Sequence, residues 1–257
     1  MGVIETSKWL ERDFANPEAV CKKLVPYFNG ISEREIYHQL TEFGMYKPSR
    51  TTRQSFESLK DANIQKKLAE LYRSYQIKWD GPDVPLFLFP IEQGGGFFRR
   101  ETKKKSGVSF PDKLFLFLSP ECSEKEIEAL FVHEYHHVCR LNKLKKDPAE
   151  FTLSDSLIIE GLAEYAVLKN CGEKYLAPWC RYYSKKQLDS FWNKYLTDHL
   201  DVRKDEKHHD ALLYGYGWIP DLLGYAAGFS LVKEYFSKNR YTTKLSFSIP
   251  AKNFLPK

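Results

Sequence analysis

Residues 131–140 contain the pattern His-Glu-x-x-His, formed by His133, Glu134 and His137. On an α-helix, two residues four positions apart lie only about 40° apart around the axis, so both imidazoles can reach one metal ion. The glutamate between them projects beside that ion, where it can take a proton from a water molecule that the metal polarises. The spacing therefore predicts a helix that carries a hydrolytic zinc site.

The sequence around this motif is typical of one long helix. Ser123 and Glu126 are spaced as a capping box just after Pro120, so we expect the helix to begin there. Its apolar face would consist of Ile127, Leu130, Phe131, Val138 and Leu141. The two motif histidines then lie well inside a helix, which fixes their mutual geometry. The alternative is that they lie on the helix surface or fill a gap in the core.

A third histidine, His136, could instead pair with His133 at a three-residue spacing. The closer alignment at four-residue spacing, and the place of Glu134 directly after the first histidine, favour His133 and His137 as the pair. For His136 we expect packing or a hydrogen bond to one of the ligands. Cys139 falls on the other side of the helix and is expected in the core.

A catalytic zinc ion needs a third protein ligand and an open position for water. The metzincin motif would require glycine at position 140 and histidine at position 143, but the chain has Arg140 and Lys143, so that class is excluded. Glu160 and Glu164 lie four residues apart in a predicted helix that begins at residues 154–156, and their neighbours are apolar. Burying two carboxylates on an apolar helix face costs free energy unless the carboxylates are paired or bind a metal. The alternative is a solvent-exposed acidic edge.

This arrangement resembles the gluzincin class of zinc peptidases, in which a helix with His-Glu-x-x-His precedes a second helix with Glu-x-x-x-Asp/Glu. It is similar in particular to an uncharacterised bacterial family expected to be zinc-dependent proteases, whose members share two further motifs. Here these read Glu-Gly-Leu-Ala-Glu at residues 160–164 and Gly-Tyr-Ala-Ala-Gly at residues 224–228. The resemblance implies that Glu160 is the third metal ligand and that Glu164 orients a ligand histidine through its free ring N–H.

Gluzincins usually supply a tyrosine or histidine from their C-terminal helical part to stabilise the tetrahedral oxyanion. By this resemblance the candidates are Tyr225, Tyr214, Tyr216, His208 and His209, of which we favour Tyr225 because it lies in the second motif. The expected reaction is peptide-bond hydrolysis with one Zn²⁺ ion. The glutamate of the first motif would deprotonate the attacking water and return the proton to the leaving amine.

The whole chain is expected to form a mostly helical α+β protein of zincin-like fold. Residues 1–80 have apolar positions at helical spacing and predict an N-terminal helical region packed on the core. Short apolar runs at residues 84–89 and 114–118 predict strands of a small mixed sheet whose edge faces the substrate cleft. Residues 81–257 would form the zincin-like domain, unless the two regions form one continuous domain.

A glycine triplet at residues 94–96 follows the first predicted strand. It lacks the Lys-Ser/Thr of a P-loop and the spacing of a dinucleotide fingerprint, so phosphate binding is disfavoured. We expect a turn, or an edge where the backbone of a bound substrate adds as a strand. The basic segment at residues 99–105 is expected to be a solvated loop.

Composition limits the remaining functions. A formal net charge of +5 over 257 residues, without a basic helix or an aromatic RNA-binding motif, argues against nucleic acid as a partner. No run approaches the ~20 apolar residues of a membrane span, and no signal peptide is visible. Five scattered cysteines without a Cys-x-x-Cys pair indicate reduced thiols. We therefore expect a cytoplasmic protein that acts on a peptide or protein substrate.

The main alternative is a non-catalytic protein derived from the same fold, which binds peptides or holds zinc for structural reasons. A structural zinc site has no need of a general base and is closed by a fourth protein ligand, so the presence of Glu134 argues against this alternative. A fourth side chain at the metal, such as His136 or a cysteine, would favour it.

Overall fold

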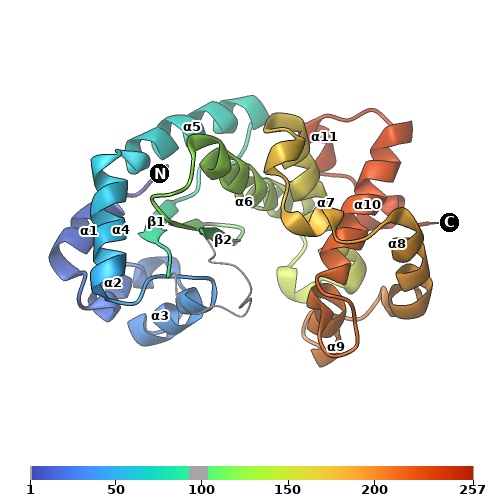
Figure 1. Cartoon of the computed structure of the whole chain (residues 1–257), viewed down its shortest axis with the longest axis horizontal. Coiled ribbons are helices and arrows are strands. Elements are labelled where there is room, and N and C mark those ends of the chain that lie inside the picture. The colour runs from blue at the N-terminus through green and yellow to red at the C-terminus, as the bar shows by residue number, and fades with distance from the viewer. Residues whose placement is uncertain (1, 93–103, 257) are drawn as a thin grey trace. The chain divides into compact units, whose positions relative to one another are not determined.

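The computed structural model describes residues 2–92 and 104–256 (Figure 1). Within these ranges the chain is mostly helical and contains one three-stranded sheet, so the predicted α+β class with a small mixed sheet is confirmed. The chain divides into two compact units, Met1–Val138 and Cys139–Lys257. The division predicted between residues 80 and 81 stays a prediction. The glycine triplet at 94–96 and residues 99–103 of the basic segment lie outside the described ranges.

The first unit begins with short helices and continues into the sheet. Its helices are α1 (Thr6–Asp13), α2 (Pro17–Lys22), α3 (Glu33–Glu42), α4 (Arg50–Asp61), α5 (Ile64–Trp79) and the greater part of α6 (Glu124–Leu144). Its strands are β1 (Leu86–Pro90), β2 (Lys105–Ser109) and β3 (Leu114–Leu118). The two apolar runs predicted as strands are therefore confirmed as β1 and β3, whereas β2 is absent from the sequence prediction.

The sheet has the order β1-β3-β2 and is mixed. β1 pairs with β3 in parallel, with Leu86 opposite Leu114. β2 pairs with β3 in the antiparallel direction, with Lys105 opposite Leu118. In this order β2 has β3 as its one neighbouring strand among the described residues, so it forms an edge of the sheet.

Alternation along the strands separates a phenylalanine face from a leucine face. The phenylalanines pack into the core formed with α1 to α4; they are Phe87, Phe89, Phe115 and Phe117. On β2, Gly107 pairs with Leu116 and Ser109 pairs with Leu114, so both lie on the leucine face. Figure 1 shows α5 and α6 on one side of the sheet and α2 and α3 on the other.

Helix α6 is the long helix that the sequence predicts around His-Glu-x-x-His. It begins at the predicted capping box, because the Ser123 N–H donates to Glu126 Oε2 (2.8 Å) and the Glu126 N–H donates to Ser123 Oγ (3.3 Å). Helix α5 packs along it through aromatic rings, with Trp79 stacked on Tyr135 at 5.8 Å. From residue 131 to residue 140 every side chain except that of His133 is buried, so the motif lies in the packed part of the helix.

The regular elements of the second unit, as far as the structure describes it, are helices, apart from an isolated β-bridge between Thr152 and Arg203. Its main helices are α7 (Leu153–Asn170), α8 (Lys185–Phe191), α9 (Lys207–Asp210), α10 (Leu223–Lys238) and α11 (Thr243–Ser246), with a π-helical turn at Ala211–Gly215. α7 begins one residue after Thr152, which forms a capping box with Asp155. In neither stretch of described chain does a helix combine the length and the apolar character that a membrane span requires.

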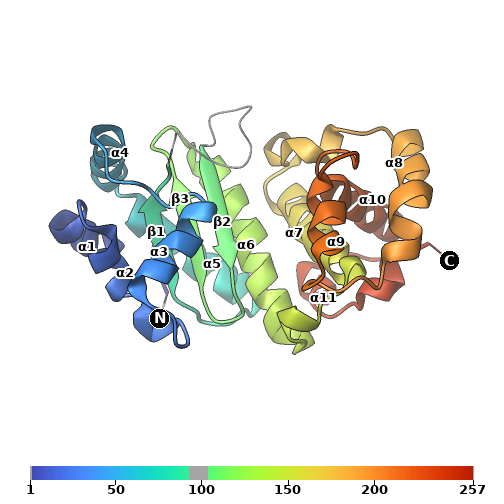
Figure 2. The same cartoon turned by 90° about the horizontal axis from the view of Figure 1, so that it is seen from below.

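Helices α7 and α10 lie side by side in very close contact (Figure 2). A Cβ atom on Gly161 of α7 would lie 2.3 Å from the Gly228 carbonyl oxygen, and one on Gly228 of α10 would lie 1.9 Å from the Leu157 carbonyl oxygen. Gly224 of α10 packs in the same way on the π-helical turn, because a Cβ atom on Gly224 would lie 2.7 Å from the Leu213 Cα atom. The glycines of the two late sequence motifs therefore allow these helix backbones to touch.

Arg140, which stands where a metzincin would have glycine, is 1% exposed. Its Nη1 donates to the Ser246 carbonyl oxygen (2.7 Å) and its Nη2 donates to the Ile249 carbonyl oxygen (2.9 Å). Burial lowers the pKa of this guanidinium to about 10, so it is charged at neutral pH. The two carbonyls compensate part of the cost of burying that charge.

Candidate metal centre

The predicted pair of histidines projects from consecutive turns of α6. The Nε2 atoms of His133 and His137 are 3.1 Å apart, and the two ring planes are perpendicular. His137 is buried and His133 is half-buried. The four-residue spacing thus brings two imidazole nitrogens to one point at the surface of a well-packed helix.

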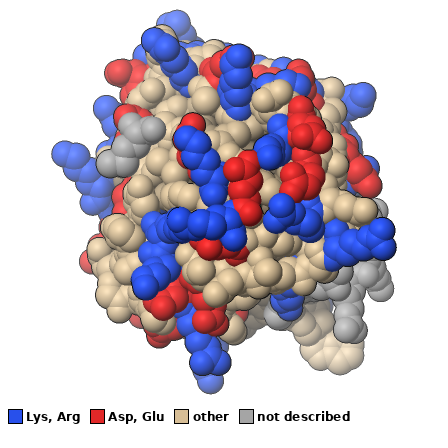
Figure 3. Space-filling model, turned by 90° about the vertical axis from the view of Figure 1, so that its left-hand side faces the viewer, with Lys and Arg blue, Asp and Glu red and all other residues tan. Residues whose placement is uncertain are grey.

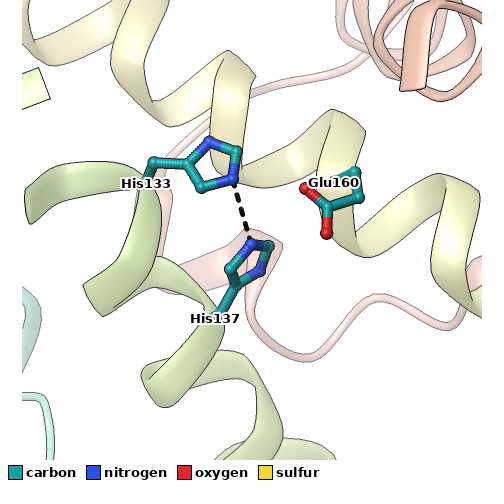
Figure 4. A group of neighbouring side chains, drawn as sticks. All are labelled: His133, His137 and Glu160. Atoms are coloured by element: carbon teal, nitrogen blue, oxygen red, sulfur yellow. Dashed lines mark hydrogen bonds between the residues drawn. The ribbon is translucent and has the colours of Figure 1, made fainter. Parts of the chain in front are cut away.

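Glu160 of α7 completes a group of three. Among the residues that the structure describes, His133, His137 and Glu160 form the group of His, Cys, Asp or Glu side chains that could hold a metal ion. One potential ligand atom from each lies within 4.8 Å of the others. Figure 4 shows the Glu160 carboxylate directed toward the two imidazoles.

The geometry of these donors suits zinc. A tetrahedral zinc ion with Zn–N bonds of about 2.0–2.1 Å holds two ligand nitrogens roughly 3.4 Å apart. The 3.1 Å between the two Nε2 atoms is close to that separation. Two imidazoles and one carboxylate are also a donor set found in catalytic zinc sites, where the fourth position is left for water.

No fourth His, Cys, Asp or Glu side chain joins this group within the described ranges. His136, the predicted packing residue, is fully buried, and its ring stands edge-on to Trp79 at 6.2 Å. Cys139 is 4% exposed, in agreement with the expected core position. The condition that would favour a closed, structural zinc site is therefore not met by these side chains.

Glu134 lies against the edge strand β2. Ser109 Oγ donates to Glu134 Oε2 (2.5 Å) and is 2.9 Å from the Glu134 backbone carbonyl oxygen. A Cβ atom on Gly107 would lie 2.5–2.7 Å from the Glu134 Cγ, Cδ and Oε1 atoms. The glutamate is 7% exposed. Its carboxylate is thus enclosed by strand atoms on one side and by its own helix on the other.

Glu164 lies one turn after Glu160 on α7 and is 3% exposed. Its Oε1 atom accepts a hydrogen bond from the Ala177 N–H (2.5 Å). This bond gives the buried carboxylate one partner in its own unit. The role expected from the family resemblance, which is to orient a ligand histidine, stays a prediction.

Tyr225, the favoured oxyanion residue, is paired with Tyr214. The two rings are 5.7 Å apart and the side chains are hydrogen-bonded. Burial, and secondarily the negative charge of Glu160, raises the pKa of Tyr214 to about 12. Tyr214 therefore keeps its phenol proton at neutral pH and lies near enough to Glu160 to be affected by its charge. The assignment of Tyr225 as the oxyanion donor stays a prediction.

The remaining oxyanion candidates are placed differently. His209 is fully buried, with Nε2 2.9 Å from Ser156 Oγ and Nδ1 3.0 Å from Asp210 Oδ1, so protein partners account for both ring nitrogens. His208 is exposed and lies beside His199. Tyr216 is 42% exposed and stacks on Tyr214.

Ser109 and Gly107 are the residues at this site that the sequence prediction lacks. β2 reads Lys-Ser-Gly-Val-Ser and contains a single large apolar residue, so it carries little strand signal. One available signal is the turn-forming Pro-Asp pair at residues 111 and 112, just before the strong β3 pattern. A short antiparallel partner before such a turn is a common arrangement.

The fold and the donor set together describe a helical α+β protein with a candidate zinc-hydrolase site. The chain belongs to the family described as "Predicted Zn-dependent protease (DUF2268)", whose model matches residues 64–256. The matched range contains α5, the sheet, α6, α7 and α10. It therefore includes every residue assigned above to the candidate metal centre.

Two proteins of Bacillus subtilis (strain 168) are similar to the chain. "Uncharacterized protein YjaZ" is 36% identical over 258 residues, which cover 99% of this chain and 98% of that protein. "Uncharacterized protein YjfC" is 25% identical over 138 residues, which cover 50% of this chain and 46% of that protein. No solved structure shows a significant match.

Proposed function

We propose that the chain is a gluzincin-type zinc peptidase, in which His133, His137 and Glu160 bind one Zn²⁺ ion and Glu134 is the general base. The observation that carries this proposal is the convergence of three ligand atoms within 4.8 Å of one another. The glutamate next to His133 is buried and held against β2. The family description supports the same chemistry.

Each residue of this site would have a distinct task. A bound zinc ion would lower the pKa of a water molecule and polarise the carbonyl of the scissile peptide bond. Glu134 would take the proton of the attacking water and pass it to the leaving amine. Tyr225, hydrogen-bonded to Tyr214, would donate a hydrogen bond to the developing oxyanion. Glu164 would orient a ligand imidazole.

The alternative of a structural-zinc or peptide-binding protein has less support. Such a zinc site would be expected to have four protein ligands, and the group in the described chain has three. A binding protein also has no chemical need for a buried carboxylate next to the first histidine. We therefore favour the enzyme over the binding module.

Replacement of Glu134 tests the proposal directly. Glu134→Gln should keep one zinc ion per chain and lower peptide hydrolysis by about 10²–10⁴-fold, because the amide cannot accept the water proton. The measurement is zinc content by metal analysis, followed by digestion of a peptide library with the parent, the variant and chelated parent.

Glu124→Gln is a matched control. It makes the same change at an exposed position in the first turn of the same helix, where Glu124 pairs with Lys67. The control should digest the library like the parent. If Glu134→Gln also cleaves as fast as the parent, or if chelation leaves hydrolysis unchanged, the proposed mechanism is wrong.

A further inference from the structure

Outside its own helix, Glu134 accepts a short hydrogen bond from a serine of the edge strand. Ser109 Oγ lies 2.5 Å from Glu134 Oε2 and 2.9 Å from the Glu134 carbonyl oxygen. A hydroxyl has one proton to donate, and the carboxylate oxygen is both the nearer and the charged acceptor. The bond therefore restrains one of the two carboxylate oxygens.

The second carboxylate oxygen of Glu134, Oε1, lies against the backbone of Gly107. It lies two residues before Ser109, so both face the same side of the sheet. A Cβ atom at Gly107 would approach Glu134 Oε1 to 2.6 Å and Glu134 Cγ to 2.5 Å. Glu134 thus packs directly on the strand backbone, in space that exists because this residue has no side chain.

We propose that Ser109 is a positioning residue that, together with the space left by Gly107, fixes the Glu134 carboxylate for proton transfer. This inference rests on the proposed function. A glutamate side chain has several rotatable bonds, and the oxygen of a general base must lie within about 2.6–3.2 Å of the water oxygen whose proton it takes. With Oε2 held by the serine, Oε1 is the oxygen left to accept the proton.

A purely structural role for Ser109 makes a different prediction. In that case the hydroxyl would join β2 to the backbone of α6, and its loss would lower stability without a specific effect on turnover. A positioning role instead lowers kcat while KM and zinc content stay unchanged, because the hydroxyl acts through its hydrogen bond to Glu134.

The test compares Ser109→Thr with Ser109→Val, which have nearly the same shape and differ in one hydroxyl. Threonine and valine both suit a strand. We expect the threonine variant to keep kcat within about threefold of the parent and the valine variant to lose about tenfold or more, as is typical for a hydrogen bond to a charged group. Equal kcat values for the two variants would overturn the inference, as would a change confined to KM.

Two further variants make the comparison specific. Gly107→Ala should also lower kcat, since its methyl group would displace the flexible Glu134 side chain while the strand remains intact. Ser106→Ala removes a hydroxyl from the opposite face of β2, where Ser106 pairs with Phe117, and should leave kcat unchanged. A parent-like Gly107→Ala variant would contradict the close packing of Glu134 on the strand.

A stability measurement separates this inference from the proposed function, because it needs no substrate. In the parent, the valine variant should unfold at a lower temperature than the threonine variant, and this difference should shrink in a Glu134→Ala background. A parent protein that cleaves no peptide would refute the proposed function. If the two variants differ in unfolding temperature by the same amount in the Glu134→Ala background as in the parent, the role of Ser109 is refuted, whatever the result of the digestion.

Discussion

Tyr214 and Tyr225 form a hydrogen-bonded pair to which the proposed mechanism assigns two different roles. Tyr225 packs against Trp179 on one side and Tyr214 on the other. Burial, and secondarily the negative charge of Glu160, raises the pKa of Tyr214 to about 12. At neutral pH Tyr214 therefore keeps its phenol proton, and its hydrogen bond with Tyr225 links the two side chains.

Removal of the Tyr225 hydroxyl should affect turnover more than removal of the Tyr214 hydroxyl. If Tyr225 is the oxyanion donor, Tyr225→Phe should lower kcat by about 10²-fold with zinc content unchanged. Tyr214→Phe should lower kcat less, because it removes a support and leaves the donor in place. The measurement is kcat and KM on one cleaved peptide. A larger loss in Tyr214→Phe than in Tyr225→Phe would reverse the two roles.

At the scale of single residues, the sequence predicts a contact between two site residues when they lie close together along the chain. The spacing of His133 and His137 is local, and the structure brings these two rings together as expected. The contact of Ser109 with Glu134 spans 25 residues and depends on strand pairing that sequence periodicity does not indicate. A serine and a glycine in a weak strand carry no signal of their own.

Among the elements, α7 and α10 are the pair whose packing depends most on glycine. Gly161 and Gly228 face each other across the helix crossing, and Gly224 meets the π-helical turn. The sequence motifs contain these glycines, but the family resemblance assigns function only to the acidic and aromatic residues beside them. The structure shows that the glycines set the distance between the helix that carries Glu160 and the helix that carries Tyr225.

Gly228→Ala tests this packing, because two effects of opposite sign compete. Alanine improves the intrinsic helix propensity by about 1 kcal/mol. Its Cβ, however, would lie 1.9 Å from a backbone oxygen of Leu157, which cannot move away by a side-chain rotation. We expect the clash to prevail, with net destabilisation of about 2 kcal/mol or more and a Tm lower by roughly 4–8 °C.

Thermal unfolding of Gly228→Ala beside Ser237→Ala provides the measurement and its control. Ser237 is an exposed residue of the same helix, so the same final residue is introduced without a clash. The control should unfold within a degree or two of the parent, which is typical of surface changes. A Gly228→Ala protein as stable as the control would show that the helices separate at little cost.

Element boundaries follow local signals closely, and the differences have local causes. The capping box at Ser123 is formed as predicted. α7 starts earlier than its predicted Ser154–Ser156 start, because Thr152 and Asp155 make the capping box instead. β2 shows the limit of this approach, since an edge strand with one large apolar residue is specified by its pairing with β3 rather than by its own pattern.

At the scale of the whole molecule, the described surface carries many ion pairs between exposed side chains. On the face drawn in Figure 3, lysine and arginine side chains alternate with aspartate and glutamate. The ion pairs of the described chain include Lys60 with Glu11 and Arg53 with Glu57. Exposed pairs of this kind contribute about 0–1 kcal/mol each. Stability therefore depends mainly on the buried groups.

Buried thiol and phenol groups predict a loss of stability at alkaline pH. Burial raises the pKa of Cys21 from 9.0 to about 12, and burial also raises the pKa of Tyr241 from 10.0 to about 12. The unfolded chain then loses these protons first, so it binds fewer protons than the folded chain between pH about 9 and 12. Their contribution is complete below pH 9 and is lost as the pH rises toward 12.

The expected result is a Tm that is nearly constant just below pH 9 and falls steadily above it. Cys21→Ala should show a shallower fall, because one of the groups that release a proton on unfolding is gone. Thermal scans at closely spaced pH values make the comparison. A Tm that stays level to pH 11, or a fall of equal steepness in Cys21→Ala, would mean that these groups do not control alkaline stability.

Arg140 has a consequence for how the protein is made on the ribosome. Its two carbonyl acceptors lie 106 and 109 residues later in the chain. At about 5–20 residues per second, translation needs roughly 5–20 seconds to reach them after α6 has been synthesised. Until then the guanidinium has to remain hydrated, which keeps the end of α6 from closing into its final packing. The nascent chain therefore gains its mature form only after residue 249 has emerged.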